Sequence, residues 1–427
     1  MSDSRLNKLI MHACNTVPYY KDLFSDMGIN AESIKCTEDL KKIPILTKKE
    51  VQRMTGRFVS SDCLQYPKNE NLIIRRTSGS TGMLLKVFWT RHDYIRSLFP
   101  LWVARRQYYG IEPDMKSCTF HTGMMEEEGM RISEISFFNS GRILSFSKHK
   151  LDKDQLTIYY NEMLAFDPEW MMLQPSVAYL LACFMTENHL EKPSGMRYME
   201  LTGEYLFDTY RSKIKEAFGI PVINQYGCEE LNSIAMECPC GNMHCLGDNA
   251  IVEVIKDGRP ANFGEAGEIH VTGLNNYTMP FIRYSLGDRG VLFPSDICSC
   301  GSRNPVIKVL AGRTGDFILV DGREPINSYI FYNAIETINR KNHNVILQFQ
   351  VTQVSNSDFE VKLVLKHASY IPEDIIIKQF TDCMSTMGLN NVNWKFIFMD
   401  SIIPHPTTGK LSFFNSNICE EAKYAAI

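Results

Sequence analysis

The chain has 427 residues, of which 44% are hydrophobic and 22% charged, and its formal net charge is −4. That length exceeds what one ordinary core requires and predicts two or three domains. The slightly acidic balance excludes a general basic field, so we expect no nucleic-acid partner and no anionic membrane surface.

Targeting signals and cysteine usage indicate the compartment. The N-terminal stretch MSDSRLNKLIMHAC lacks the apolar run of a signal peptide, and no stretch approaches the length that crosses a bilayer. The chain has 13 cysteines, an odd number, and without an export signal a disulfide framework is not expected. We therefore expect a cytoplasmic protein.

Taken in chain order, the first 50 residues predict helices, interrupted at VPYY and at KKIPILTKKE, where Thr47 is a helix cap. Residues 72–77 then predict a strand, and residues 92–110 predict an amphipathic helix that ends at Gly110. Strand and helix patterns alternate afterwards, as in an α/β sheet: strands at 168–174, 197–203 and 221–227, with helices at 175–188 and 211–219.

Two further patterns complete the predicted fold. Residues 249–258 and 267–274 alternate in polarity, which predicts an antiparallel or barrel-like section. After Gly312 come two strands, a helix and another strand, typical of a small α+β domain. The predicted fold is thus a large N-terminal α/β domain with mixed sheets (1–312), a hinge (313–316) and a small mobile C-terminal α+β domain (317–427).

A cluster of hydroxyls and glycines follows the first predicted strand. It comprises Thr77, Ser78, Gly79, Ser80, Thr81 and Gly82. Backbone N–H groups and hydroxyls in such a loop can converge on phosphate oxygens. It is not the P-loop of NTPases, because no lysine follows Gly82 directly. Alone, such a cluster is more often a surface turn, so the motifs that accompany it decide whether it is a functional loop.

Four companion motifs follow in order. NQYGCEE places Glu230 beyond a Tyr-Gly turn, where a carboxylate can hold Mg²⁺. IRYSLGDRG places Asp288 between glycines as an acceptor for ribose hydroxyls. GRTGD carries Arg313 at the domain join, and HPTTGKL carries Lys410. Each motif alone is typical of a solvated loop, but the ordered set predicts a nucleotide site.

The set TSGSTG, YGCEE, YSLGDRG, GRTGD and TTGKL resembles the signature series of the adenylate-forming superfamily of acyl-CoA synthetases. VPYYKDLF, DLKKIPILTKKEV and LQPSVAYLLA resemble its phenylacetate–CoA ligase-like branch, and the likeness spans residues 17–411. It implies ATP-dependent attack of a carboxylate on the α-phosphate, giving an acyl-adenylate and pyrophosphate. A thiol, most often that of CoA, then displaces AMP.

The resemblance also implies roles for residues. Thr77–Gly82 would hold the β- and γ-phosphates. Glu230 would hold Mg²⁺, and Asp288 would bind the ribose. Lys410 would bridge the carboxylate and the α-phosphate, and Arg313 would reach the ribose and phosphates. The remaining nucleotide contacts, including the adenine wall, would be Gly203, Glu204, Asn224, Gln225, Tyr226 and Gly227.

The chain departs from the family pattern at several positions. Leu84 and Leu85 stand where many relatives have Pro-Lys, so Lys86 comes one place late for a phosphate ligand. Glu229 replaces the usual threonine before Glu230. Gly315 replaces the usual Asp or Lys of the hinge, where a glycine readily absorbs backbone rotation.

Two cysteine groups predict a metal site. ECPCGNMHC and ICSCGSR each contain C-x-C-G, and tetrahedral Zn²⁺ sites use four sulfur or nitrogen ligands. Cys298 and Cys300 supply two ligands, and the other two come from the first group, which offers Cys238, Cys240, His244 and Cys245. Similarity to zinc-bearing members of the branch favours Cys238 and His244, with Cys240 as the main rival. Four protein ligands would make the zinc structural.

Several alternatives stay open. The substrate is a small carboxylic acid, most simply an aryl or arylacetic acid. The acceptor is CoA or, as a rival, a carrier-protein thiol or an amine. A zinc-bearing binding module without activity is a distant third, and a catalytically silent relative a fourth. The sequence leaves the oligomeric state open, a homodimer included.

Overall fold

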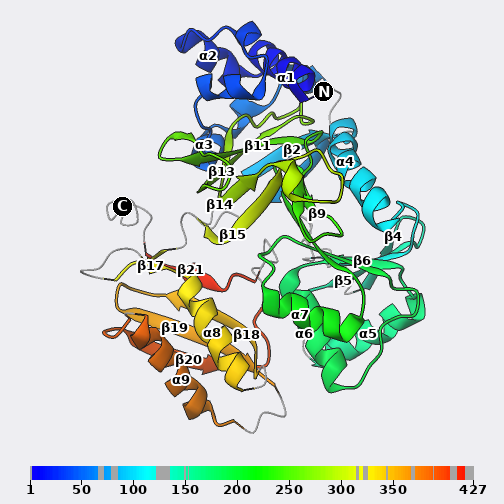
Figure 1. The fold of residues 1–427 in the computed structure, drawn as a ribbon, viewed down its shortest axis with the longest axis vertical. Helices are drawn as coiled ribbons and strands as arrows, with labels where there is room; N and C mark the ends of the chain where they lie inside the picture. The colour runs from blue at the N-terminus through cyan, green and yellow to red at the C-terminus, as the bar shows by residue number, and fades with distance from the viewer. Residues whose placement is uncertain are drawn as a thin grey trace. The chain divides into compact units, whose positions relative to one another are not determined.

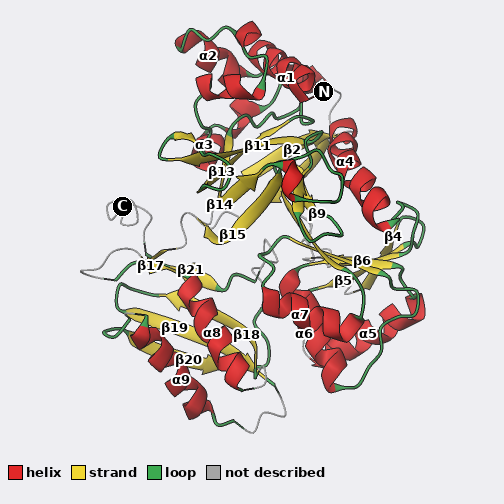
Figure 2. Cartoon of the chain, viewed as in Figure 1, coloured by secondary structure: helices red, strands yellow, loops and turns green. Residues whose placement is uncertain are grey.

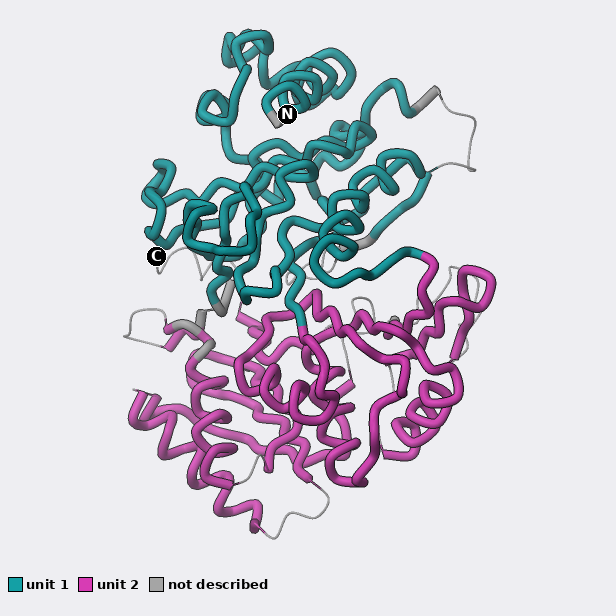
Figure 3. The backbone as a smooth tube through the Cα atoms, turned by 45° about the vertical axis from the view of Figure 1, so that its right-hand side comes forward, with its two compact units in different colours: residues 1–113, 223–310 teal, residues 114–222, 311–427 magenta. Residues whose placement is uncertain are grey.

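The computed structural model describes residues 2–65, 72–77, 85–121, 135–148, 151, 153–313, 317–320, 326–342, 345–366, 371–387, 389–403 and 411–418. The chain forms two compact units (Figure 3). Unit 1 comprises Met1–Pro113 and Ile223–Leu310, and unit 2 comprises Asp114–Val222 and Ala311–Ile427. The division into 1–312, a hinge at 313–316 and 317–427 stays a prediction. Of the helices in these ranges, none has the length and apolarity to cross a bilayer.

Unit 1 begins with the predicted helices α1 (Ser2–Thr16), α2 (Pro18–Asp26) and α3 (Lys48–Arg53) (Figure 1). Short 3-10 helices lie between and after them, at Ala31–Ser33, Thr37–Lys42, Thr55–Phe58 and Ser61–Gln65. The predicted cap is confirmed, because Thr47 and Glu50 form a capping box at the start of α3. The buried Tyr20 hydroxyl donates to the Pro280 carbonyl at 3.0 Å, which fixes α2 against a distant loop.

The rest of unit 1 is largely antiparallel. The hairpin β1 (Leu72–Thr77)–β2 (Leu85–Thr90) leads into α4 (Arg91–Tyr109), which ends at Gly110 with a φ of 65°, as predicted. The sheet has the order β12-β11-β13-β14-β15-β10-β9-β8 within this unit. Its strands are β8 (Val222–Cys228), β9 (Asn232–Glu237), β10 (Met243–Cys245), β11 (Ala250–Lys256), β12 (Arg259–Pro260), β13 (Ala266–Gly273), β14 (Tyr284–Phe293) and β15 (Val306–Arg313). The pairs β11–β13 and β13–β14 confirm the predicted antiparallel section.

The first part of unit 2 has the predicted α/β character. Its strands have the order β7-β6-β3-β5-β4, and β3–β5, β3–β6 and β6–β7 pair in parallel. Helices α5, α6 and α7 lie beside these strands (Figure 1). The elements are β3 (Ser117–His121), β4 (Ile135–Phe138), β5 (Ile143–Ser147), α5 (Lys153–Phe166), β6 (Trp170–Leu173), α6 (Pro175–Glu187), β7 (Tyr198–Thr202) and α7 (Asp208–Phe218).

The C-terminal part of unit 2 is the predicted α+β assembly. A sheet of order β20-β19-β18-β21 packs with α8 (Tyr329–Lys341) and α9 (Glu373–Thr386) on one face (Figure 2). Its strands are β18 (Ile346–Gln353), β19 (Asp358–Leu365), β20 (Asn393–Phe398) and β21 (Phe414–Ser416), and a separate pair joins β16 (Phe317–Ile318) to β17 (Ile326–Asn327). Its buried core includes Phe331, Phe359 and Phe380, and also Phe207, which directly precedes α7.

A buried histidine in β13 predicts how the stability of unit 1 depends on pH. His270 is 1% exposed, and neither ring nitrogen has a hydrogen-bond partner among the described residues. Burial together with Arg283 lowers its pKa to about 4. The Glu268 carboxylate lies 3.6 Å from Nε2. The pKa of His270 is lower in the folded than in the unfolded protein. The stability that neutral His270 contributes is therefore fully present above about pH 6.5 and is lost as the pH decreases towards 4. We expect a loss on the order of 3 kcal/mol, measured by native-state hydrogen exchange of β13.

The control for this prediction is His270→Phe, which keeps a buried ring but cannot be protonated. That variant should lose this part of the pH dependence. An identical pH profile in both proteins would show that His270 is not responsible.

Candidate functional site

The predicted phosphate loop connects the two strands of a hairpin in unit 1. Thr77 ends β1 and pairs with Leu85 at the start of β2. Residues 78–84, and with them Ser78, Gly79, Ser80, Thr81 and Gly82, lie outside the described residues. Lys86 is exposed on β2 opposite Arg76. The described strands therefore fix only the positions where the loop begins, at Thr77, and ends, at Leu85.

Arg75 connects this hairpin to the YGCEE motif. Its Nη2 donates to the Tyr94 hydroxyl at 2.6 Å, and its guanidinium lies 5.1 Å from the centre of the same ring. Its Nε lies 3.8 Å from Oε2 of Glu229. Glu229, the residue that departs from the family pattern, thus faces a cation on the strand that leads to the loop.

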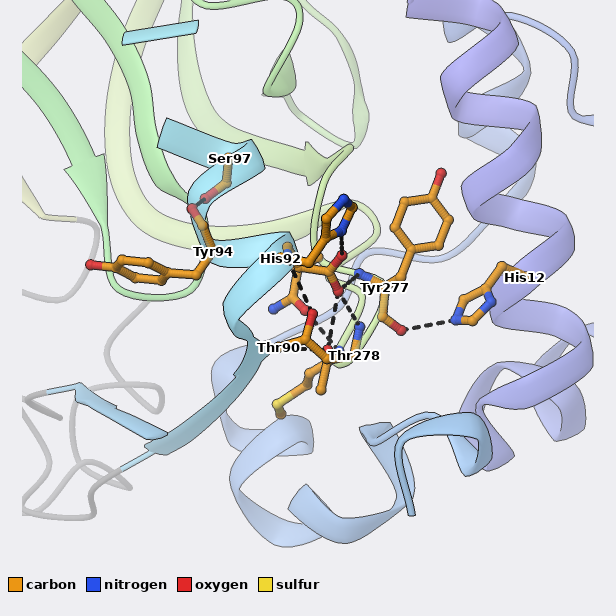
Figure 4. Close-up of polar contacts among 10 residues, drawn as sticks. His12, Thr90, His92, Tyr94, Ser97, Tyr277 and Thr278 are labelled. Carbon is orange, nitrogen blue, oxygen red and sulfur yellow. Dashed lines mark hydrogen bonds and ion pairs between the residues drawn. The ribbon is translucent and has the colours of Figure 1, made fainter. Parts of the chain in front are cut away.

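The base of the hairpin is fixed at β2 as well (Figure 4). The Thr90 N–H donates to Oγ1 of Thr278 at 3.0 Å, and the Thr90 hydroxyl caps α4 by accepting from the Asp93 N–H at 3.1 Å. The buried Asp93 carboxylate accepts from the N–H groups of Tyr277 and Thr278 at 3.1 and 3.2 Å, and from the Thr278 hydroxyl at 3.1 Å. Three donors on one buried carboxylate hold the start of α4 against the 277–278 segment.

Glu230 is buried next to a cation that the sequence analysis missed. It is 5% exposed, and its Oε1 accepts from the Tyr284 hydroxyl at 3.0 Å and lies 3.9 Å from Nζ of Lys48. Backbone hydrogen bonds of Leu46 with Arg283 and Ser285 hold the segment before Lys48 against β14. The only sequence signal near Lys48 was the Thr47 cap. That cap predicted where α3 starts, but it did not indicate which carboxylate the first residue of α3 would face.

Tyr226 and Asp288 lie together. The Tyr226 hydroxyl donates to Oδ2 of Asp288 at 2.8 Å. Asp288 was predicted in a turn and lies instead within β14, where Gly287 has a φ of 72° and the register with β13 shifts. Such an irregularity re-aims side chains, so the glycine still explains where Asp288 points. Gly227 is obligatory, because a Cβ there would lie 2.2 Å from the Asn232 carbonyl oxygen.

The remaining residues of unit 1 in the predicted nucleotide site lie along β8. The Asn224 N–H donates to Oε2 of Glu237 at 2.8 Å, and Gln225 is buried with its Nε2 donating to the Tyr226 carbonyl at 2.9 Å. Arg313 ends β15, and its side chain lies outside the described part of the chain.

Gly203 and Glu204 belong to unit 2. Gly203 has a φ of 87°, a conformation that favours glycine. The Glu204 carboxylate accepts from the Ser176 N–H at 3.1 Å and from the Leu411 N–H at 3.4 Å. Lys410 lies outside the described residues.

The cysteine groups meet in unit 1. One ligand atom from each of Cys238, His244, Cys298 and Cys300 lies within 4.8 Å of the others. The Cys238 and Cys298 sulfurs are 3.5 Å apart, and His244 Nε2 is 3.1 Å from the Cys300 sulfur. Four ligands 2.3 Å from a tetrahedral Zn²⁺ lie about 3.8 Å apart, so the cluster has the dimensions of a zinc site.

The surroundings of the cluster also fit a metal. His244 Nδ1 lies 2.9 Å from the Asn304 carbonyl, to which it donates as the Nδ1–H tautomer, and this leaves Nε2 for a ligand bond. Burial opposes ionisation of Cys298, but hydrogen bonds from Cys300 and His244 lower its pKa to about 6. Cys240 is exposed with its sulfur 3.5 Å from the Ser299 hydroxyl, and Cys245 is buried outside the cluster.

No family model matches the chain. It is 24% identical over 333 residues to the phenylacetate–coenzyme A ligase of Thermus thermophilus, which covers 75% of this chain and 72% of that enzyme. It is 23% identical over 383 residues to the phenylacetate–coenzyme A ligase of Escherichia coli, covering 86% and 83%. Protein CapK of Staphylococcus aureus is 22% identical over 421 residues, covering 98% and 89%.

Solved structures resemble the whole chain. A 2-hydroxyisobutyryl-CoA ligase, determined in the postadenylation state with a bound adenylate, has a TM-score of 0.74 at 16% identity, covering 99% of this chain and 90% of that one. An anthranilate CoA ligase in complex with anthranoyl-AMP has a TM-score of 0.54 at 15% identity, covering 83% and 67%. These likenesses confirm the predicted fold, a mixed α/β body followed by a smaller C-terminal sheet.

Proposed function

We propose that this chain, which is related in sequence to the phenylacetate–coenzyme A ligases and has the fold of adenylate-forming ligases, is an ATP-dependent carboxylate–thiol ligase. A carboxylate attacks the α-phosphate of ATP, and pyrophosphate leaves. The thiol of CoA then attacks the acyl carbon, and AMP leaves with loss of the thiol proton. We further propose a cytoplasmic location and an aryl or arylacetic substrate.

One observation carries the proposal: side-chain contacts in unit 1 join segments that are far apart in the sequence. Arg75 of the phosphate hairpin faces Glu229, the Tyr284 hydroxyl binds Glu230, and Tyr226 binds Asp288. A structural core does not require charged and hydroxylic side chains from three motifs to pair with one another. A site for a magnesium–nucleotide does require them, because it must match phosphates, a cation and ribose hydroxyls.

Each group then has a task in the first step. The Tyr226 hydroxyl orients the Asp288 carboxylate, which accepts from the ribose hydroxyls. Glu230 would hold Mg²⁺, which would neutralise phosphate charge when bound, and the contacts of Lys48 and Tyr284 with this carboxylate fix its orientation. Thr77–Gly82 donate to the departing pyrophosphate, and Lys410 meets the charge that develops on the α-phosphate.

The experiment that tests this function is ATP–pyrophosphate exchange over a panel of carboxylic acids. We expect aryl or arylacetic acids to stimulate exchange, and CoA to consume the adenylate as a thioester. Exchange that no acid stimulates would overturn adenylation.

The acceptor is tested separately. Protein CapK matches nearly the whole chain and its name specifies no thiol, so a carrier-protein thiol or an amine is the second candidate acceptor. With the responsive acid, product formed with a carrier protein or an amine but not with CoA would favour this alternative.

We also propose a structural zinc held by Cys238, His244, Cys298 and Cys300. Cys298→Ser should reduce bound zinc from stoichiometric to near background and increase amide exchange in β10, because a metal bond to folded ligands stabilises the fold. Zinc content by mass spectrometry checks this. Cys240→Ser is the matched control and should keep its zinc, whereas full zinc in Cys298→Ser would exclude that ligand.

A further inference from the structure

Within unit 2, the start of α7 contacts α8 of the C-terminal part through a small set of side chains that are buried or, for Thr209, partly buried. We call Phe207, Thr209, Tyr332 and Glu336 the α7–α8 clasp. The Phe207 and Tyr332 rings stack with centroids 3.4 Å apart and an interplanar angle of 11°. Both rings are buried, at 7% and 4% exposure. Flat stacking of two buried rings fixes the rotation of α8 as well as its distance from α7.

A chain of hydrogen bonds accompanies the stacked rings. The Thr209 hydroxyl donates to Oε1 of Glu336 at 2.7 Å and lies 2.8 Å from the Tyr332 hydroxyl. Because Thr209 has one hydroxyl proton, Tyr332 is the donor of the second bond. Burial raises the pKa of Tyr332, so its hydroxyl keeps that proton. Glu336 is itself 8% exposed, and its other oxygen, Oε2, lies 4.0 Å from Nε of Arg340. Loss of the Thr209 hydroxyl would therefore remove one donor from a buried carboxylate.

The same region of unit 2 holds the segment that follows Lys410. The Glu204 carboxylate accepts from the Leu411 N–H and, through its other oxygen, from the Ser176 N–H at the start of α6. Phe413 contacts Phe207 edge to face, with centroids 6.4 Å apart. The Phe413 carbonyl accepts from the Val351 N–H at 2.8 Å, and β21 then pairs with β18. Residues 411–416 are thus held at one end by Glu204 and at the other by the sheet.

We propose that the α7–α8 clasp and Glu204 are positioning residues for the first half-reaction, since they fix the C-terminal sheet and residue 411 in one arrangement. This inference depends on the proposed function, because it assumes that Lys410 acts in adenylation. In the thioester step the acid no longer attacks the α-phosphate of ATP, so the positive charge of Lys410 is not needed between them. Loosening the clasp should therefore slow adenylation selectively.

The test uses Thr209→Val, which keeps the shape of the side chain and removes the hydroxyl. Glu204 is not varied, because it is also a predicted nucleotide contact. We expect the maximal rate of acid-stimulated ATP–pyrophosphate exchange to fall about tenfold, as for loss of a hydrogen bond to a buried charge. The KM for ATP and thioester formation from preformed acyl-adenylate should each stay within about twofold of the wild-type value.

Two further variants separate positioning from general damage. Thr209→Ser restores the hydroxyl and should recover the exchange rate. Thr337→Val removes a hydroxyl that donates to the Asn333 carbonyl within α8, and should change nothing. Amide exchange of residues 329–341 should increase in Thr209→Val alone. Equal losses in both half-reactions of Thr209→Val would overturn the proposal. So would an unchanged rate of ATP–pyrophosphate exchange together with unchanged amide protection of residues 329–341.

The two levels of inference fail in different ways. If no acid stimulates exchange in the wild-type protein, the proposed function is wrong, and with it the catalytic part of this inference. If the wild-type protein adenylates and Thr209→Val does so at the same rate, only the positioning role is wrong.

Discussion

Lys410→Ala should reduce acid-stimulated ATP–pyrophosphate exchange by about 100- to 1,000-fold, the loss typical of removing one preorganised donor at a developing charge. Negative charge accumulates on the α-phosphate as the carboxylate attacks, and under the proposed mechanism the lysine ammonium neutralises it. In the second step the thiol attacks an acyl carbon and AMP leaves, so this contribution is smaller. Thioester formation from preformed acyl-adenylate should therefore change much less.

The matched control is Lys395→Ala. Lys395 lies on β20 in the same C-terminal sheet, is 72% exposed and pairs with Glu360 at 3.0 Å, so its loss removes a surface charge only. This variant should keep both half-reactions. If Lys410→Ala reduced the two half-reactions equally, the assignment of Lys410 to adenylation would be wrong.

Local patterns were sufficient to predict most elements. The helix after β2 was predicted to be amphipathic and to end at Gly110, and α4 does end there in a left-handed conformation. The amphipathic part of that prediction was wrong, because α4 buries the polar Asp93, Ser97 and Arg105 and exposes the apolar Ile95, Phe99 and Val103. Short apolar runs between helical patterns predicted β6 and β7, which pair in parallel. These predictions succeed because periodicity, caps and breakers are properties of a few neighbouring residues.

Contacts between distant segments could not be predicted in the same way. Lys48 and Glu230 are 3.9 Å apart in the structure, but nothing near Lys48 in the sequence indicates a carboxylate partner. Asp93 was part of a predicted helix, and its three donors come from residues 277 and 278. Conversely, the cysteine spacing narrowed the candidate metal ligands to a few residues, and the family resemblance favoured Cys238 and His244 over Cys240. The structure groups Cys238 and His244 with Cys298 and Cys300, whereas Cys240 is exposed outside that group.

Glu253→Gln should destabilise unit 1 by about 3–5 kcal/mol, because it leaves the charge of a buried guanidinium without its counterion. Arg283 contacts the two Glu253 carboxylate oxygens at 3.1 Å and donates to the Ile43 carbonyl at 2.6 Å. The side chains of both residues are about a tenth exposed or less, at 7% and 10%. Burial raises the pKa of Glu253, and the hydrogen bonds from Arg283 oppose that shift.

The pair joins three segments, so its loss should be measured where they meet. Native-state hydrogen exchange of β11, β13 and β14 reports unit 1 by itself, because a chain of two units need not unfold in a single step. Glu265→Gln is the matched control: Arg259 also contacts both Glu265 oxygens, at 3.1 and 3.3 Å, but on an exposed surface. That variant should change protection little.

The double variant Glu253→Leu with Arg283→Met separates the two contributions to this effect. Replacing both charges with apolar side chains removes the unpaired guanidinium, so protection should recover towards the wild-type level. A double variant as unstable as Glu253→Gln would instead show that the unpaired guanidinium charge alone does not explain the results, because the double variant also lacks the Arg283 hydrogen bond to Ile43 that Glu253→Gln retains.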